Sequence, residues 1–490
     1  MLAFMALWTR KSLESLRRDA ESNVLRRSLG PWNLTALGVG SIIGTGIFVL
    51  TGTAASTNAG PALVLSMVIS AIGCAFSGLC YAEFASMTPV AGSAYTYAYA
   101  TLGELIAWII GWDLILEYAL STATVAVGWS GYFVSLAKDL GISLPAALTQ
   151  APFNLPAILV VGLVAALLVI GVKESANANT ALVIVKSLVL VLFVAVGASY
   201  VRRANLTPFI PPNTGEFGAF GWSGVLRGAG VMFFAYIGFD AVSTAAQEAR
   251  DPARDMPVGI LGSLAICTLL YIGVAIVLIG IVPYTHLNVA DPLAVGIDAT
   301  GLTWMRPIVK GAALLGLFST MLVTLLGQTR IFFSMSQDGL LPRVFAVVHP
   351  RFRTPHLSTI LTGTIVALVA GVTPIAVLSQ LVSIGTLLAF VLVSVGIVIL
   401  RRTAPDLPRP FRTPWVPVVP LAGAAICLLQ MVALPLGTWL RLLTWLAVGL
   451  TVYALYGWRH AQPNVPVNGP SPDRAAHSSV QLDTNFDSAS

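Results

Sequence analysis

Residues 38–52 read GVGSIIGTGIFVLTG, and this stretch decides the fold because it interrupts the first strongly apolar segment of the chain. The glycines within it are Gly38, Gly40, Gly44, Gly46 and Gly52. Each glycine costs about 1 kcal/mol in a helix relative to alanine. We therefore expect a membrane helix that is interrupted between Ile42 and Gly46. The alternative is an unbroken helix whose glycines only permit close packing against a neighbour.

The composition identifies the class of protein. Of the 490 residues, 56% are hydrophobic and 10% are charged, whereas soluble domains average roughly 25% charged residues. This indicates an all-α, multi-pass membrane protein in contact with the lipid bilayer. The net charge of +6 is spread over short segments without interleaved aromatic residues, so no nucleic-acid partner is expected. The four cysteines lie in apolar runs without metal-ligand spacing, and neither a metal nor a cofactor is expected.

Apolar runs of about 20 residues predict about twelve spans. They lie near 34–57, 62–87, 101–133, 156–172, 180–201, 222–247, 258–283, 305–334, 357–373, 376–400, 415–435 and 439–459. The expected organisation is a tail (1–31), a first repeat (32–201), a second repeat (221–400), two further spans (414–459) and a disordered tail (460–490). Basic residues gather on one side of these spans. This favours a plasma (inner) membrane location with both termini in the cytosol.

A second apolar segment, at 224–249, is also rich in glycine and reads GVLRGAGVMFFAYIGFDAVSTAAQEA. Interrupted helices at corresponding positions of two halves point to an inverted repeat with a binding site between them. A half-helix that begins near Thr45 and Gly46 would offer free N–H groups to a carboxylate. Freed carbonyls would suit an ammonium group, and they are expected near Ile42, Ile43, Phe234, Ala235 and Ile237. An α-amino acid carries both groups.

Four further groups of polar residues within the spans are candidates for function. Lys186 stands alone in TALVIVKSLVLVLF, where burial favours loss of its proton, unless it reaches the nearby membrane surface by snorkelling. Asp113 and Glu117 share a helix face and could receive a cationic side chain, exchange a proton, or pair with a basic residue. Ser319 and Thr320 lie near the middle of the eighth span, where hydroxyls usually bond to the preceding turn. Glu83, Glu104 and Asp240 read as peripheral or capping residues.

Four motifs occur in a characteristic order. They are GSIIGTGIFVLTG, YAEFASMTPVAGSAYTYAYATLGEL through GWDLILEY, FFAYIGFDAVSTAAQEARDPARDMPVGI, and GQTRIFFSMSQDGLLP. Together they resemble the amino acid–polyamine–organocation superfamily, and within it the cationic amino acid transporter family of bacterial type. The resemblance runs from about Pro31 to about Trp458. It implies a LeuT-like fold of 5+5 inverted repeats followed by two further helices.

The resemblance also implies roles for particular residues. The substrate carboxylate would meet Ile43, Thr45 and Gly46, and the amine would meet carbonyls of Ile42, Phe234, Ala235 and Ile237, with Phe234 as a lid. Lys186 matches a lysine that bridges the first and eighth helices in proton-coupled relatives, with the Gly44 carbonyl and a hydroxyl of Ser319 or Thr320 as partners. Glu117 resembles a residue of relatives that take cationic substrates. Met321, Thr324 and Asp113 are the further candidates for side-chain recognition.

The function expected from these features is permease activity, not catalysis. We expect proton-coupled uptake of L-amino acids, cationic or small and neutral, by alternating access. The substrate and protons are then the partners. The alternatives are a proton-independent exchanger, an amino acid sensor, and an intramembrane enzyme that uses Asp113 and Glu117 to hold magnesium.

Overall fold

The computed structural model describes residues 29–87, 93–171, 176–244, 246, 249–352 and 354–461. Most of the two expected tails, 1–31 and 460–490, therefore lies outside the described residues. Helices account for nearly all of the regular structure, and a short antiparallel hairpin of β1 (Thr149–Gln150) and β2 (Phe153–Asn154) supplies the only described strands.

The described part of the first half of the chain contains nine α-helices and their short helical extensions. The α-helices are α3 (Pro31–Ile42), α4 (Thr51–Ala54), α5 (Leu63–Met87), α6 (Ser93–Thr101), α7 (Glu104–Asp139), α8 (Leu155–Ile170), α9 (Ala176–Gly197), α10 (Gly221–Met232) and α11 (Phe239–Thr244). The short extensions are η1 (Gly46–Leu50), η2 (Ala55–Ala59), η3 (Gly60–Ala62), η4 (Ala146–Leu148), η5 (Ala198–Tyr200), η6 (Arg203–Leu206) and η7 (Phe233–Tyr236).

The second half continues in the same way. Its α-helices are α12 (Pro252–Ile281), α13 (Pro292–Thr300), α14 (Met305–Gln337), α15 (His356–Val372), α16 (Ile375–Thr403), α17 (Val418–Ala433), α18 (Leu436–Val452) and α19 (Trp458–His460). Its short turns are η9 (Tyr284–His286), η10 (Arg343–Ala346) and η11 (Tyr453–Gly457). A helix or an interrupted helix stands at each of the twelve expected positions, although the LeuT-like arrangement of repeats remains a prediction.

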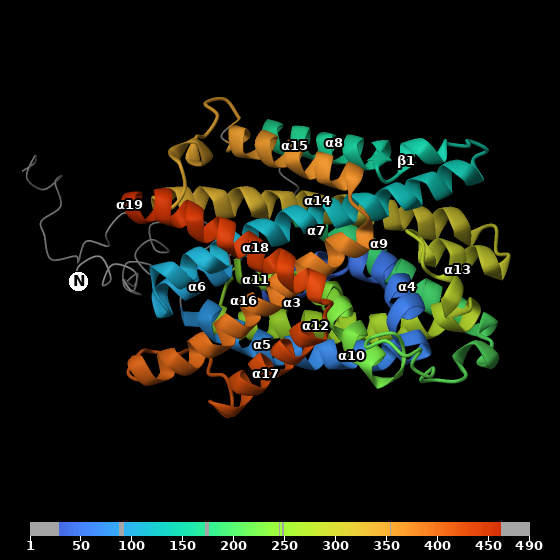
Figure 1. Cartoon of the computed structure of the whole chain (residues 1–490), viewed down its shortest axis with the longest axis horizontal. Helices are drawn as coiled ribbons and strands as arrows, with labels where there is room; N and C mark the ends of the chain where they lie inside the picture. The colour runs from blue at the N-terminus through green and yellow to red at the C-terminus, as the bar shows by residue number, and fades with distance from the viewer. Residues whose placement is uncertain are drawn as a thin grey trace, which may run out of the picture.

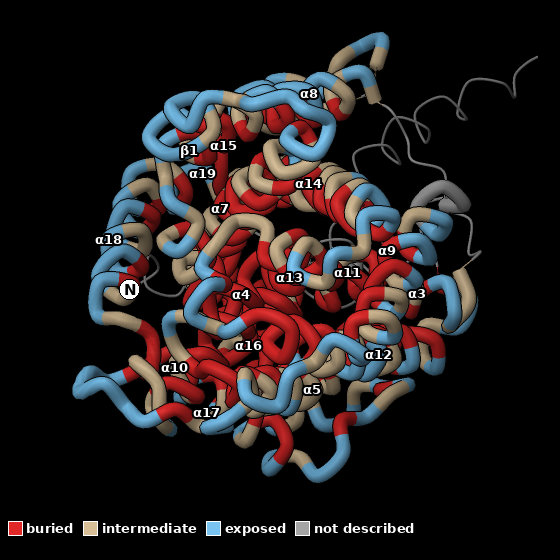
Figure 2. Tube along the Cα trace, turned by 90° about the vertical axis from the view of Figure 1, so that its right-hand side faces the viewer, coloured by how far each residue is buried: buried red, intermediate tan, exposed pale blue. Residues whose placement is uncertain are grey.

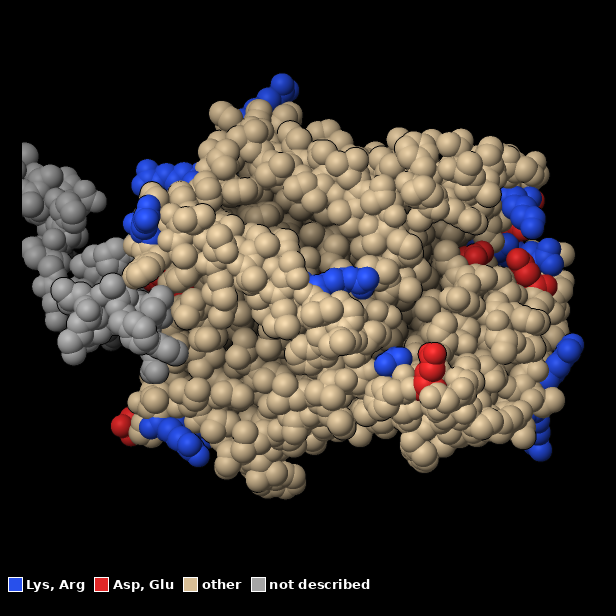
Figure 3. Space-filling model, viewed as in Figure 1, with Lys and Arg blue, Asp and Glu red and all other residues tan. Residues whose placement is uncertain are grey.

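Long apolar helices and the placement of charge identify a membrane protein. Seven helical segments in the described part of the chain are long and apolar enough to cross a membrane. Figure 3 shows most Lys, Arg, Asp and Glu toward the two ends of the long axis, with a wide belt between them that carries only a few charged groups. Large apolar side chains face outward along the helices, and Leu269 and Leu368 are 74% and 61% exposed. Such a surface is stable in lipid because apolar groups there meet hydrocarbon.

The helices lie roughly along the long axis and form a bundle (Figure 1). α7 packs along α14 and α16, and α12 packs against both α3 and α5. α8 and α15 pack on each other and form an outer layer beside α7 and α14. Figure 2 shows that the buried residues concentrate in the centre of the bundle, while α8 and α18 lie at its edge and expose many residues. The centre of the bundle is therefore where a polar site can be protected from lipid.

Two ion-pair clusters join segments near the ends of the bundle. Arg401 donates two hydrogen bonds to the Glu83 carboxylate, at 2.8 and 2.9 Å, and Arg409 lies 3.3 Å from it. At the other end of the bundle, Lys310 lies 2.6 Å from Asp139 and 3.1 Å from Asp298. Glu83 is thus a fully buried pairing residue of α5 and not the peripheral or capping group expected. Its burial is compatible with charge because two guanidinium groups contact it.

Candidate functional site

A pocket opens where the two glycine-rich helices are interrupted. It is lined by residues of both interruptions, of α7 and of α14. The lining residues are Ser41, Ile42, Gly44, Thr45, Gly46, Glu117, Tyr118, Ser121, Val125, Phe234, Ile237, Gly238, Asp240, Thr320, Val323 and Thr324. Four elements that are far apart in sequence therefore converge on one site at the centre of the bundle.

The first interruption falls where the sequence predicts it. α3 ends at Ile42, Ile43 adopts an extended conformation with ψ of 95°, and η1 begins at Gly46. The last bond of α3 runs from the Ile43 N–H to the Val39 carbonyl. Because the helix does not continue, the carbonyls that follow Val39 lack their usual partners four residues later. They are available to side chains or to a ligand.

Side chains donate hydrogen bonds to three of these carbonyls. Lys186 Nζ lies 3.2 Å from the Gly40 oxygen and 3.3 Å from the Ile43 oxygen. The Tyr271 hydroxyl donates to the Ile42 oxygen at 2.8 Å. A carbonyl oxygen has two lone pairs, so Ile42 retains the capacity to accept a bond from a substrate ammonium group.

Lys186 is fully enclosed and connects α9 with α3 and α14. Its side chain is 1% exposed, and Nζ lies 3.5 Å from Thr320 Oγ1. The Thr320 hydroxyl donates its own hydrogen to the Gly316 carbonyl at 3.0 Å, which leaves its lone pairs to accept from Lys186. Of the two hydroxyls expected, the described contact is that of Thr320; Ser319 is buried in the preceding position.

The described bonds of Lys186 go to the carbonyls of Gly40 and Ile43. The Gly44 carbonyl implied by the resemblance stays a prediction. The Gly44 carbonyl already accepts the Phe48 N–H at 3.2 Å, as the first bond of the new helical turn. Gly44 instead permits a close approach to α14, because a Cβ at this position would lie 3.1 Å from Thr320 Cγ2.

The start of η1 presents donors to the pocket. The first N–H groups of a helix have no acceptor within that helix, and the positive end of the helix dipole points the same way. Thr45 adds a side-chain donor: it is 1% exposed, lines the pocket, and its hydroxyl has no partner among the described residues. A buried hydroxyl without a partner is unfavourable, and a carboxylate in the pocket would relieve this.

The second interruption lies against the first. η7 ends at Tyr236, Ile237 is extended with ψ of 135°, and Gly238 has a φ of +121°, which favours glycine. A Cβ on Gly238 would lie 2.8 Å from the Ser41 carbonyl group. A Cβ on Gly46 would lie 2.2 Å from the Ala235 Cα. Both glycines are therefore required for the two interrupted helices to touch.

The pocket also contains carboxylates and hydroxyls of α7 and α11. Glu117 is 2% exposed and lines the pocket, and the Tyr118 hydroxyl is hydrogen-bonded to Asp240. Thr324 is bonded to Thr122 at 2.8 Å, so one of its polar contacts is already made within the protein. Sequence reasoning did not identify Tyr118, Ser121 or Val125, and it placed Asp240 at the periphery. The helical spacing of Glu117, Ser121 and Val125 was the signal available, because residues four apart share a face.

Several expected residues lie beside the pocket and not in its described lining. Lys186 is bonded to the Ile43 carbonyl just outside the lining. Ala235 contacts the lining residue Gly46. Ser319 and Met321 are buried on α14, and Asp113 is buried on α7 one turn from Glu117. The structure thus brings together Ile42, Gly44, Thr45, Gly46, Glu117, Phe234, Ile237, Thr320 and Thr324.

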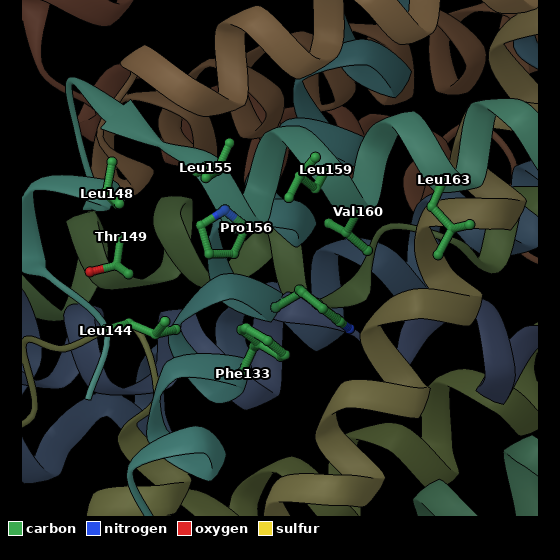
Figure 4. Close-up of a pocket in the computed structure, with 10 residues that line it drawn as sticks. Phe133, Leu144, Leu148, Thr149, Leu155, Pro156, Leu159, Val160 and Leu163 are labelled. Carbon is green, nitrogen blue, oxygen red and sulfur yellow. The ribbon is translucent and has the colours of Figure 1, made fainter. Parts of the chain in front are cut away.

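A second cavity of about 310 Å³ lies at the outer edge of the bundle. Figure 4 shows its lining, which comes from the end of α7, the hairpin region and α8. Trp129 and Phe133 stack there with ring centroids 5.1 Å apart, opposite Leu159 and Leu163. Its walls are almost entirely apolar, and Leu159 is 62% exposed. It lacks the donors and acceptors that a zwitterion requires.

The interrupted helices and the polar pocket between them, in a multi-pass helical membrane protein, define a transporter. Residues 29–452 match the family model described as "Amino acid permease". The chain is 46% identical over 466 residues to the methylthioribose transporter of Bacillus subtilis, covering 94% of this chain and 99% of that protein. It is 47% identical over 470 residues to the branched-chain amino acid permease BcaP of the same organism, with the same coverage.

A plant relative extends the comparison. The vacuolar cationic amino acid transporter 4 of Arabidopsis thaliana is 38% identical over 412 residues, which cover 82% of this chain and 68% of that protein. The chain belongs to the amino acid permease family. This confirms the resemblance identified from the four sequence motifs, and the named relatives are transporters and permeases, not enzymes.

Proposed function

We propose that the protein takes up an L-amino acid together with protons, by alternating access across the plasma membrane with both termini in the cytosol. The observation that carries the proposal is the pocket at the two interruptions. Its walls offer donors at Thr45 and at the start of η1, and acceptors at the end of α3. The separation of donors and acceptors suits the carboxylate and the ammonium of one zwitterion.

The part of the pocket that would receive the substrate side chain favours a neutral substrate whose side chain is branched or small. Val125, Val323 and Phe234 line it, and the Thr122 to Thr324 bond leaves the α14 wall with few free polar groups. Two relatives at similar identity are named for a branched-chain amino acid and for methylthioribose. Glu117 is the feature that would favour a cationic substrate, as the name of the plant relative suggests.

Lys186 is the group we assign to proton coupling. As an ammonium ion, it bridges the end of α3 and Thr320 of α14 through the three bonds described above. Loss of its proton removes one donor and the positive charge, which weakens this bridge. Movement of α3 relative to α14 would then accompany proton release, which would couple the rearrangement of the pocket to the proton gradient.

The test is uptake into proteoliposomes that contain the purified protein. With an inward proton gradient, labelled leucine is expected to accumulate above its equilibrium level, and unlabelled leucine, isoleucine or valine should compete better than lysine or arginine. Unlabelled methylthioribose is included as a competitor. An exchanger would show counterflow at the same rate with and without the proton gradient, and no accumulation under the gradient. This result would contradict proton coupling. Binding without flux would indicate a sensor.

A further inference from the structure

Asp113 is a buried acid that the proposed transport cycle does not yet use. It lies on α7, is 1% exposed, and neither of its carboxyl oxygens has a hydrogen-bond partner among the described residues. A Cβ built on Gly385 would lie 2.7 Å from Asp113 Oδ1 and 3.2 Å from Oδ2. The carboxyl group therefore packs against the backbone of α16, which leaves no room for a guanidinium or ammonium group on that side.

Glu117 lies one helical turn from Asp113 and lines the substrate pocket. Its Oε2 is also buried without a partner in the described structure. Residues at i and i+4 have Cβ atoms about 5–6 Å apart, so two ionised carboxyls at these positions would repel each other. The two acids thus form a pair that leads from the pocket along α7 toward its Glu104 end.

Thr386 distinguishes the two members of the pair. Its hydroxyl donates to the Val382 carbonyl at 3.1 Å and lies within hydrogen-bonding reach of Glu117. Rotation of this hydroxyl lets it donate to an ionised Glu117 or accept from a protonated one. Asp113 has no such donor to stabilise its charged form. The negative charge of Asp240 next to Glu117 acts in the opposite direction. Glu117 nevertheless lines the pocket, whereas Asp113 is enclosed without a described partner, so we place the proton of the pair on Asp113.

Basic groups on the neighbouring helices do not neutralise Asp113. α7 packs against α6, α8, α14, α15, α16 and α18. No ionisable residue of these helices makes a described bond to Asp113. The ionisable residues are Tyr95, Tyr97 and Tyr99 on α6, Arg306, Lys310 and Arg330 on α14, His356 on α15, Arg401 and Arg402 on α16, and Arg441 on α18; α8 has none. Asp240 of α11 adds a further negative charge next to Glu117.

We propose that Asp113 is a neutral carboxylic acid at neutral pH and that it exchanges its proton with Glu117. The exchange requires the two side chains to rotate into contact, because no described hydrogen bond joins them. The O–H bond of Asp113 then breaks, an O–H bond forms on Glu117 Oε2, and the negative charge moves from Glu117 to Asp113. The pair is a second proton-holding site, separate from Lys186, and it begins at the pocket wall with Glu117. The transport role of this site rests on the proposed function, whereas the protonation state of Asp113 does not.

Infrared difference spectroscopy of the full-length protein in liposomes tests the proposal, because a protonated carboxyl has a carbonyl stretch that a carboxylate lacks. Asp113→Asn is expected to remove the intensity of one protonated carboxyl at neutral pH. Asp406→Asn changes an exposed carboxylate and should leave the band unchanged. Glu117→Gln should keep the protonated-carboxyl band of Asp113. The band should disappear at a lower pH than in wild type, because the neighbouring negative charge is gone.

An Asp113→Asn spectrum that is identical to wild type would overturn the proposal. An unchanged Asp113 titration in Glu117→Gln would overturn proton sharing. If Asp113→Asn does not fold, Gly385→Ala is the alternative variant, because it keeps the acid and places a Cβ against Asp113 Oδ1. The carbonyl stretch of Asp113 should then change frequency. An unchanged frequency would also contradict the assignment. Wild-type proteoliposomes report gradient-driven uptake separately, so failure of the transport mechanism is distinguishable from failure of the Asp113 assignment.

Discussion

Gly46 and Ala235 are in contact where the two interrupted helices meet, so closely that a Cβ on Gly46 would lie 2.2 Å from the Ala235 Cα. The neighbour is backbone, which cannot rotate away as a flexible side chain would. This contact sets the separation of η1 and η7, and with it the shape of the pocket between them.

Gly46→Ala should therefore separate η1 from η7 and abolish substrate uptake. Overpacking of this kind costs about 1–3 kcal/mol, so the variant should also unfold at a lower temperature. The matched control is Gly162→Ala on α8, where a Cβ would meet nothing within 4 Å; it should transport normally and be at least as stable as wild type. Normal uptake by Gly46→Ala would show that the contact does not shape the site.

Thr45→Val tests whether the unpartnered hydroxyl binds substrate. The change keeps the side-chain shape and removes a buried hydroxyl that has no described partner, so we expect unchanged or increased stability. Loss of a bond to a charged carboxylate should weaken binding about tenfold or more. The measurement is the substrate concentration needed for half-maximal thermal stabilisation. Thr124→Val, whose hydroxyl bonds to the Leu120 carbonyl at 2.7 Å, is the control and should bind normally.

Tyr271→Phe tests the role of the Ile42 carbonyl. The variant removes the 2.8 Å hydrogen bond to that oxygen and should lower stability by about 1 kcal/mol. It should also alter substrate affinity, since the Ile42 carbonyl is assigned to the substrate amine. Tyr236→Phe removes a similar buried bond, to the Met67 carbonyl at 3.1 Å, and should lower stability alone. Equal affinities for the two variants would contradict the assignment of Ile42.

Asp291 gives a prediction about pH and stability. It precedes α13, outside the long apolar helices, and burial raises the pKa of its carboxyl despite a hydrogen bond with Ser135 and the attraction of Lys310. The folded state then binds the proton more tightly than the unfolded state does. Stability contributed by Asp291 is consequently lost as the pH rises above about 4, the ordinary range of an aspartate, through the raised pKa.

Asp291→Asn should remove this pH-dependent loss. Thermal unfolding in detergent between about pH 4 and pH 7 measures it, with Asp406→Asn as the exposed control. The prediction would be refuted if the unfolding temperature of Asp291→Asn changed with pH as steeply as that of wild type.

The sequence allowed prediction of the features that depend on local chemistry. The position of the break between Ile42 and Gly46 follows from glycine content in an apolar segment. The burial of Lys186 follows from its isolation in an apolar span. The family is confirmed by the comparisons because motifs of this length and order are specific.

Features that depend on contacts between distant segments were not predictable in detail. The described acceptors of Lys186, the carbonyls of Gly40 and Ile43, are set by where α3 ends. The choice between Ser319 and Thr320 depends on the rotation of α14, which its sequence pattern alone does not fix. Asp240 enters the pocket because the positive φ of Gly238 redirects the chain just before α11.

The central claim is that Lys186 couples proton movement to substrate movement, and Lys186→Met tests it most directly. Methionine retains a long, unbranched side chain but cannot bond to Gly40, Ile43 and Thr320. In proteoliposomes with an inward proton gradient, wild type and Lys138→Met, which alters an exposed lysine, should accumulate substrate. Lys186→Met should not accumulate it. Accumulation by Lys186→Met to the wild-type level would contradict the account.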